Sequence, residues 1–178
     1  IFWTLPKEIL ADPQQLNSYS YAHNNPIINS DPTGKYAEVV MKNMGWIPGV
    51  HGFVNIVPEK GENLSQYNLN GGNGSHYTIG GYHNGNIPWT NRLQAQINNS
   101  GDYNTKASDK LAIYPLDVPK GMTPAQYDRK LLESGYALTQ QDLGPYFSLG
   151  RPTSPHANSG NTWTQVIIDA GGKVPKPN

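Results

Sequence analysis

Cysteine is absent from the 178 residues, which excludes disulfides, thiolate nucleophiles and zinc sites built on thiolates. No apolar run reaches the roughly 20 residues that cross a bilayer as a helix, so we expect no membrane span. Charged side chains make up 15% of the chain and balance at 13 against 13. Because nucleic-acid-binding proteins usually carry a basic excess, we expect no nucleic-acid partner.

Glycine, proline and tyrosine are abundant, at 19, 15 and 11 residues, which favours a loop-rich fold that contains a sheet. Three segments rich in β-branched and aromatic residues predict strands, at residues 50–57, 76–82 and 110–118. Residues 35–44 are compatible with a short helix or a strand. The early connections are loops rather than crossover helices, so we expect an antiparallel sheet.

Two helices are predicted after the strands. Thr123 and Gln126 match a capping box with proline at the first helical position, which predicts a helix over 123–135 that ends at Gly135. Apolar residues at i, i+3, i+4 and i+7 from Trp163 predict an amphipathic helix at about 160–170 that buries Trp163. The sequence thus predicts an α+β fold with a small antiparallel sheet and two helices.

A turn-rich motif occupies residues 16–34, which read LNSYSYAHNNPIINSDPTG. Its Asn-Asn-Pro and Asp-Pro-Thr-Gly steps favour turns, because asparagine and glycine tolerate left-handed backbone and proline fixes φ. The spacing L-N-x-Y-x-Y-x-x-N-N-P followed by D-P-x-G resembles the Rhs-repeat-associated core at the end of Rhs/YD-repeat shell proteins. We assign this resemblance to residues 12–34.

The resemblance implies two domains, a remnant of the Rhs core at 1–34 and a variable C-terminal effector domain at 35–178, often a toxin. It also implies three further expectations. The Rhs/YD-repeat shell of a parent protein is a partner, a cognate immunity protein is a second possible partner, and the effector is secreted or delivered into a target cell.

Ser159 and His51 are the leading catalytic candidates. Ser159 precedes the C-terminal helix, where free backbone N–H groups and the positive end of the helix dipole can stabilise an oxyanion. His51 lies in a predicted strand and can serve as the base that a serine nucleophile needs. Residues 48–172 resemble a circularly permuted papain-like fold, with Ser159 at the position of that family's cysteine. This resemblance implies a Ser/His hydrolase or acyltransferase acting on an acyl or amide bond.

Three other histidines leave alternatives open. His76 or His83 could orient His51, and His156 could replace His51 as the base. For each candidate there is a purely structural interpretation, since a serine before an apolar helix is most often an N-cap worth about 1 kcal/mol.

Two other functions stay open. A non-enzymatic tip domain that binds a partner fits the many tyrosines, asparagines and glycines. An ADP-ribosyltransferase fits the pair His76-Tyr77 together with Glu133 as a distant acid. No metal-binding motif and no phosphate-binding loop occurs in the sequence, so we expect no cofactor.

Overall fold

The computed structural model describes residues 37–43, 49–59, 61–84, 92–144 and 159–176, without the side chains of 84 and 159–161. The chain divides into two units, 1–34 and 35–178, and all described residues belong to the second unit. The segment that resembles the Rhs core therefore lies outside the described residues.

Five strands form one antiparallel sheet in the order β4-β3-β2-β1-β5. The strands are β1 (Ala37–Asn43), β2 (Val50–Ile56), β3 (Tyr77–Asn84), β4 (Arg92–Ile97) and β5 (Lys110–Pro115). The helices are α2 (Ser100–Tyr103), α3 (Pro124–Thr139) and α4 (Ser159–Asp169), and short 3-10 turns occupy Ser65–Tyr67 and Ala107–Asp109. The predicted α+β class with an antiparallel sheet is confirmed.

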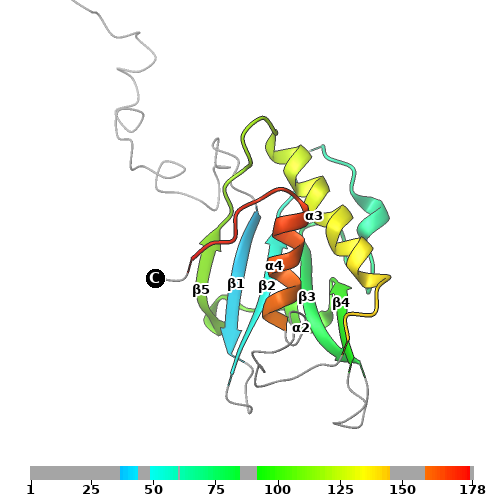
Figure 1. The fold of residues 1–178 in the computed structure, drawn as a ribbon, viewed down its shortest axis with the longest axis vertical. Helices are drawn as coiled ribbons and strands as arrows, with labels where there is room; N and C mark the ends of the chain where they lie inside the picture. The colour runs from blue at the N-terminus through cyan, green and yellow to red at the C-terminus, as the bar shows by residue number, and fades with distance from the viewer. Residues whose placement is uncertain (1–36, 44–48, 60, 85–91, 145–158, 177–178) are drawn as a thin grey trace, which may run out of the picture. The chain divides into compact units, whose positions relative to one another are not determined.

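Helices α3 and α4 pack on the same face of the sheet, which we name the helix face (Figure 1). The hydrophobic core lies between these helices and the strands, where Val54, Ile79 and Ile167 are fully buried. Successive side chains of a strand point to opposite faces. Each strand therefore presents one set of side chains to the core and a second set to the opposite face.

The strand predictions at 50–57, 76–82 and 110–118 correspond to β2, β3 and β5, and the ambiguous segment 35–44 contains β1. The sequence analysis did not predict β4. Its residues alternate strictly, with Leu93, Ala95 and Ile97 buried between more exposed polar neighbours. That period of two is the signal of a half-buried strand.

Helix α3 begins as predicted. The Thr123 hydroxyl accepts a hydrogen bond from the Gln126 backbone N–H at 3.2 Å, and the Gln126 side chain accepts one from the Thr123 N–H at 2.9 Å. The predicted end at Gly135 is wrong, because α3 continues to Thr139. Gly135 serves close packing instead: a Cβ atom there would lie 2.8 Å from Cδ1 of Ile79.

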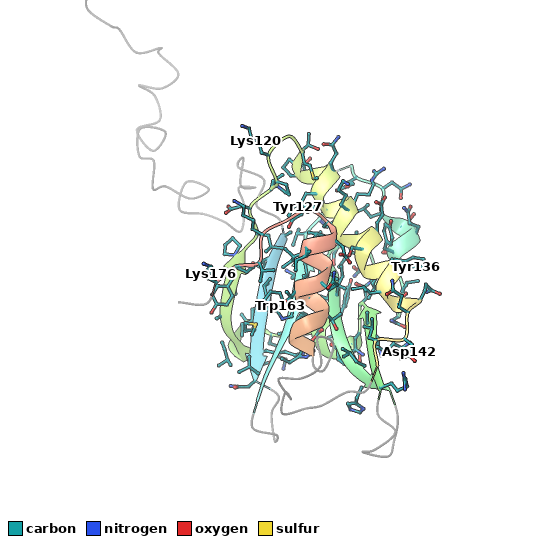
Figure 2. All side chains as sticks on the ribbon, viewed as in Figure 1. Lys120, Tyr127, Tyr136, Asp142, Trp163 and Lys176 are labelled. Atoms are coloured by element: carbon teal, nitrogen blue, oxygen red, sulfur yellow. The ribbon has the colours of Figure 1, made fainter. Side chains whose placement is uncertain are left out.

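Helix α4 matches the predicted span of about 160–170. Val166, Ile167 and Ala170 are buried as expected, and Gly171 follows the helix with a φ of +83°. Trp163, labelled in Figure 2, packs against the core but is only partly buried, which corrects the prediction that it is buried. A Cβ atom on Gly52 of β2 would lie 2.6 Å from the Trp163 indole nitrogen, so a glycine is needed for α4 to approach the sheet this closely.

Helix α2 has only four residues and follows β4 after two asparagines, Asn98 and Asn99. Asn98 adopts a positive φ of 54°, and its buried side chain binds the backbone N–H of Thr78 at 3.0 Å. Asn99 then caps the helix, since its side chain accepts a hydrogen bond from the Gly101 N–H at 2.9 Å. These two asparagines fix where the last two residues of α2, Asp102 and Tyr103, lie.

Candidate functional site

His51 projects from β2 toward the face opposite the helices. Val54 and Ile56 belong to the core, and Gly52 meets Trp163 of α4, so the even-numbered residues of β2 face the helices. By alternation, His51 and Phe53 face the other way. Their rings lie 6.1 Å apart between centroids, both on this opposite face.

Asp102 of α2 holds the His51 ring. The carboxylate oxygens Oδ1 and Oδ2 lie 3.0 and 3.1 Å from His51 Nε2. His51 is 5% exposed and Asp102 is 2% exposed, so water screens the contact little. A buried carboxylate beside an imidazole is the usual arrangement by which a protein orients a histidine base.

Lys42 completes this cluster from β1, where it pairs directly with His51 across the β1–β2 ladder. Its Nζ atom lies 2.9 Å from Asp102 Oδ1 and donates a hydrogen bond to the Thr105 hydroxyl at 3.3 Å. It also donates to the Gly101 carbonyl. The buried carboxylate therefore has a cationic partner within ion-pair distance, as burial of a charge requires.

The electrostatics keep Asp102 ionised. Burial raises the pKa of Asp102, but the hydrogen bonds and the electrostatic attraction from His51 and Lys42 outweigh burial and hold this pKa below its ordinary value. The ring centroid of Tyr82 lies 5.1 Å from that of His51, and the pKa of Tyr82 shifts upward, whereas that of Asp102 shifts downward. Burial and the negative charge of Asp102 raise the pKa of Tyr82, so Tyr82 stays a neutral phenol.

These contacts fix the tautomer of a neutral His51. An ionised carboxylate only accepts hydrogen bonds, so the proton between the two groups belongs to His51 Nε2. The other ring nitrogen, Nδ1, is then the one that can take up a proton. His51 is in this sense a base of defined orientation.

The second predicted histidine, His76, is also oriented by α2. Its Nε2 atom lies 3.1 Å from the backbone carbonyl of Tyr103, and its ring stacks on the Tyr103 ring at 4.1 Å and 13°. Its Nδ1 atom lies 3.1 Å from the Ser75 hydroxyl. Because a carbonyl only accepts, Nε2 carries the proton in the neutral ring, and the Ser75 hydroxyl donates to Nδ1.

A hollow of about 280 Å³ lies between these groups, and we name it the strand-face hollow. Its lining comes from β2, from the turn before β3, from α2 and from β5. The lining residues are Phe53, Asn55, Val57, Ser75, His76, Asp102, Tyr103, Thr105 and Lys110. The residue that holds His51 and the residue that holds His76 thus border the same space.

The predicted partner of His51 is Ser159. Ser159 begins α4, which packs on the helix face, whereas His51 faces the opposite side. The side chain of Ser159 and the whole of His156 lie outside the described residues, so their roles stay predictions. His76 does not orient His51 in the described contacts, because its two ring nitrogens bind Ser75 and Tyr103.

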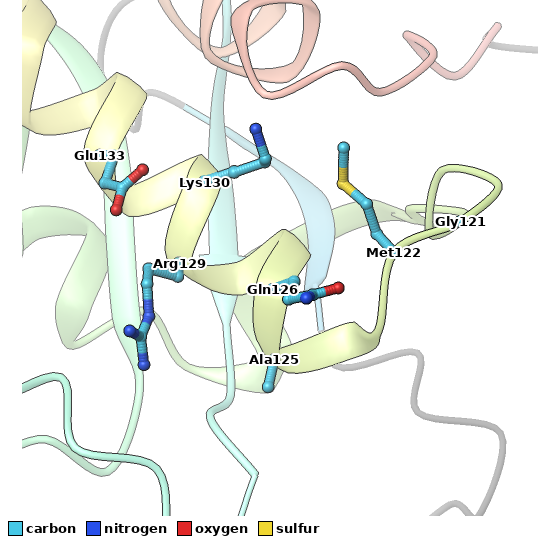
Figure 3. A pocket seen from close by; sticks show the side chains of 7 residues that line it. All are labelled: Gly121, Met122, Ala125, Gln126, Arg129, Lys130 and Glu133. Carbon is cyan, nitrogen blue, oxygen red and sulfur yellow. The ribbon is translucent and has the colours of Figure 1, made fainter.

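The residues of the ADP-ribosyltransferase hypothesis lie apart. Glu133 is on α3, the helix-face side of the sheet, and lines a different hollow of about 560 Å³. Figure 3 shows this second hollow, where Arg129 and Lys130 point in different directions from the helix. Its lining is a run of surface side chains of α3 and the turn before it, without a histidine or a hydroxyl. Tyr77 is buried in the core and does not accompany His76 in the strand-face hollow.

Within the described ranges, no group of three His, Asp or Glu side chains is arranged to hold a metal ion. No helix of this part of the chain is both long and apolar enough to cross a membrane.

Sequence reasoning missed Lys42, Ser75, Asp102 and Tyr103. The sequence contains a signal for Ser75 and a weaker one for Asp102. Ser75 places a hydroxyl beside the imidazole of His76, directly after the turn Gly71-Gly72-Asn73-Gly74. For Asp102 the only signal is Asn99, a possible N-cap three residues earlier. Lys42 is a charged residue in a largely apolar strand, which marks it as unusual but does not identify Asp102 as its partner.

Comparisons with known proteins add no family: no family model, no curated protein sequence and no solved structure matches this chain. The geometry of the described residues therefore carries the functional argument.

Proposed function

We propose that residues 35–178 are the C-terminal effector domain of an Rhs-type polymorphic toxin that acts as a hydrolase or acyltransferase on an acyl or amide bond. His51 is an acid–base residue of this activity and Asp102 is its positioning residue. One observation carries the proposal: α2 orients two imidazoles, His51 through the Asp102 side chain and His76 through the Tyr103 carbonyl.

The burial of the cluster supports a functional role. Burying an ion pair costs free energy of desolvation, and replacing a buried ion pair by apolar residues is often neutral or stabilising. A lysine, an aspartate and a histidine gathered on one face, next to a hollow, are therefore a candidate site in their own right. The Rhs-like motif at 12–34 supplies the biological context of the proposal.

The test is growth of bacteria that express the chain in the cytoplasm or export it to the periplasm. We expect the wild type to arrest growth in at least one compartment, and His51→Ala and Asp102→Asn to relieve the arrest. Asp109→Asn is the matched control, because Asp109 is exposed and lies outside the cluster. Thermal unfolding of each purified variant separates lost activity from lost folding.

Two outcomes would contradict the proposal. One is a folded His51→Ala variant that remains fully toxic, and the other is a wild type without effect in both compartments. If both variants unfold, the His51 tautomer of the wild type decides, since ¹⁵N chemical shifts distinguish Nε2–H from Nδ1–H. A proton on Nδ1 of the neutral ring would remove the base that we assign.

A partner-binding domain is the second candidate function, and a specific surface favours it. Leu111 and Ile113 on the edge strand β5 are 51% and 45% exposed, which is unusual for two large apolar side chains so close together. Toxicity or binding that survives His51→Ala but is lost in Ile113→Lys would favour this candidate.

A further inference from the structure

The strand-face hollow holds a second arrangement that the paired His51 and Asp102 do not use. The Ser75 hydroxyl, the His76 ring and the Tyr103 carbonyl form a continuous chain, with 3.1 Å at each of its two contacts. All three residues line the hollow. A hydroxyl, a base within hydrogen-bond reach and a third group that orients the base are the components of an activated nucleophile.

We propose that Ser75 is the nucleophile of the site and that His76 is its general base. This inference deepens the function proposed above and rests on it. The Tyr103 carbonyl takes the orienting role that a carboxylate plays in the Ser-His-Asp arrangement. It fixes the proton on His76 Nε2 and leaves Nδ1 to accept the proton of Ser75.

The surroundings hold both side chains in place. The Ser75 backbone N–H donates to the Asn73 side chain at 2.9 Å, so the turn before β3 is closed. The Asn73 N–H in turn donates to the Tyr103 hydroxyl at 3.0 Å. Tyr103 thereby contacts the turn through its hydroxyl and His76 through its ring and carbonyl. Ser75 itself is exposed, which gives a substrate access to the hydroxyl.

The reaction proceeds in two balanced steps. The Ser75 oxygen attacks the carbonyl carbon of an ester or amide while its proton passes to His76 Nδ1. As the bond to the leaving group breaks, that proton passes to the departing alcohol or amine, and an acyl ester remains on Ser75. Water then adds to this ester, the acid is released, and Ser75 recovers its proton, so one water is consumed for each bond cleaved.

The size of the hollow indicates the substrate class. At about 280 Å³ it lies just below the range of about 300–1,000 Å³ that accommodates drug-sized ligands. Phe53 and Val57 supply apolar lining, whereas Asn55, Thr105 and Lys110 supply polar groups. We therefore assign a short acyl group, or an amide of amino-acid size, rather than a long lipid chain.

The experiment uses a fluorophosphonate probe, which an activated serine attacks with release of fluoride, followed by peptide mapping of the intact full chain by mass spectrometry. We expect the label on Ser75. Ser75→Ala should abolish it, and His76→Ala should slow labelling by about 10²–10⁴-fold, the typical contribution of a general base. Ser108→Ala is the matched control, because Ser108 is an exposed serine that binds only its neighbour Asp109 in the described contacts.

An unlabelled wild type would overturn the inference, as would a label on Ser159 or a labelling rate that His76→Ala leaves unchanged. The labelling assay is independent of growth arrest. If His51→Ala relieves toxicity but Ser75 is not labelled, the proposed function stands and this inference fails. If Ser75 is labelled but no variant affects growth, the nucleophile stands and the effector role fails.

Discussion

Asp128 is a buried carboxyl whose ionisation should make the protein less stable as the pH rises. The residue lies on α3, is 2% exposed, and its Oδ2 atom has no hydrogen-bond partner among the described residues. Burial first, and then the negative charges of Glu62 and Glu59, raise the pKa of Asp128 from 3.8 to about 7. The folded protein thus favours the neutral acid.

The direction of the pH effect follows from this raised pKa. Between about pH 4 and pH 7 the folded protein holds a proton that the unfolded chain has released, so stability falls as pH rises through this window. Each pKa unit corresponds to about 1.4 kcal/mol. Keeping Asp128 ionised at pH 8 therefore costs on the order of 4 kcal/mol, a large part of a typical total of about 5–15 kcal/mol.

The substitution Asp128→Asn tests this argument, because asparagine has nearly the same shape and no charge. Urea unfolding at pH 8 should give a free energy of unfolding about 2–4 kcal/mol higher than that of the wild type, and the difference should shrink toward zero near pH 4. Glu62→Gln should give a smaller change in the same direction, since it removes one of the negative charges beside Asp128.

Asp109→Asn is the control for this prediction, because it makes the same chemical change at an exposed position. Its effect should stay within about 0.5 kcal/mol at both pH values. The reasoning fails if Asp128→Asn is no more stable than the wild type at pH 8, or if its gain is the same at pH 4 and pH 8.

Three further predictions concern packing and domain organisation. In Gly80→Ala the new Cβ would lie 2.5 Å from Asp102 Oδ2 and 3.3 Å from His51 Nε2, so we expect a loss of roughly 1–3 kcal/mol and a changed His51 ring signal by NMR. Ile167→Ala should cost roughly 2–5 kcal/mol in urea unfolding, whereas Ile168→Ala, at a side chain 52% exposed, should change little. A chain that lacks residues 1–34 should still unfold cooperatively on heating, and a broad, non-cooperative transition would contradict the predicted domain boundary.

Periodicity and capping predicted much of the fold. The strand β2 lies between turn-forming residues and is rich in β-branched side chains, and both reciprocal hydrogen bonds of the Thr123 capping box are present. Helix α4 follows from the spacing of Val166, Ile167 and Ala170. These are local rules, which depend only on neighbours along the chain, and so they can be read from one sequence.

Where the local rules failed, tertiary packing decided the outcome. Many helices end with a glycine, yet Gly135 lies inside α3, where the helix approaches Ile79 too closely for a larger residue. Gly52 has a similar role beneath Trp163. A glycine that ends a helix and one that permits a close approach look alike in a single sequence, and only the contact distinguishes them.

The candidate site shows the same limit more sharply. The two histidines could be singled out from the sequence, but the groups that orient them come from α2, a helix too short to leave a periodic pattern. The direction of His51 depends on one alternation in β2: the glycine at 52 faces the helices, and so the histidine at 51 faces away from them. A register shifted by one residue would have turned His51 toward α4 and the predicted Ser159. Labelling of the active serine distinguishes the two candidates: a label on Ser75 supports a site in the strand-face hollow, and a label on Ser159 supports the interpretation made from the sequence.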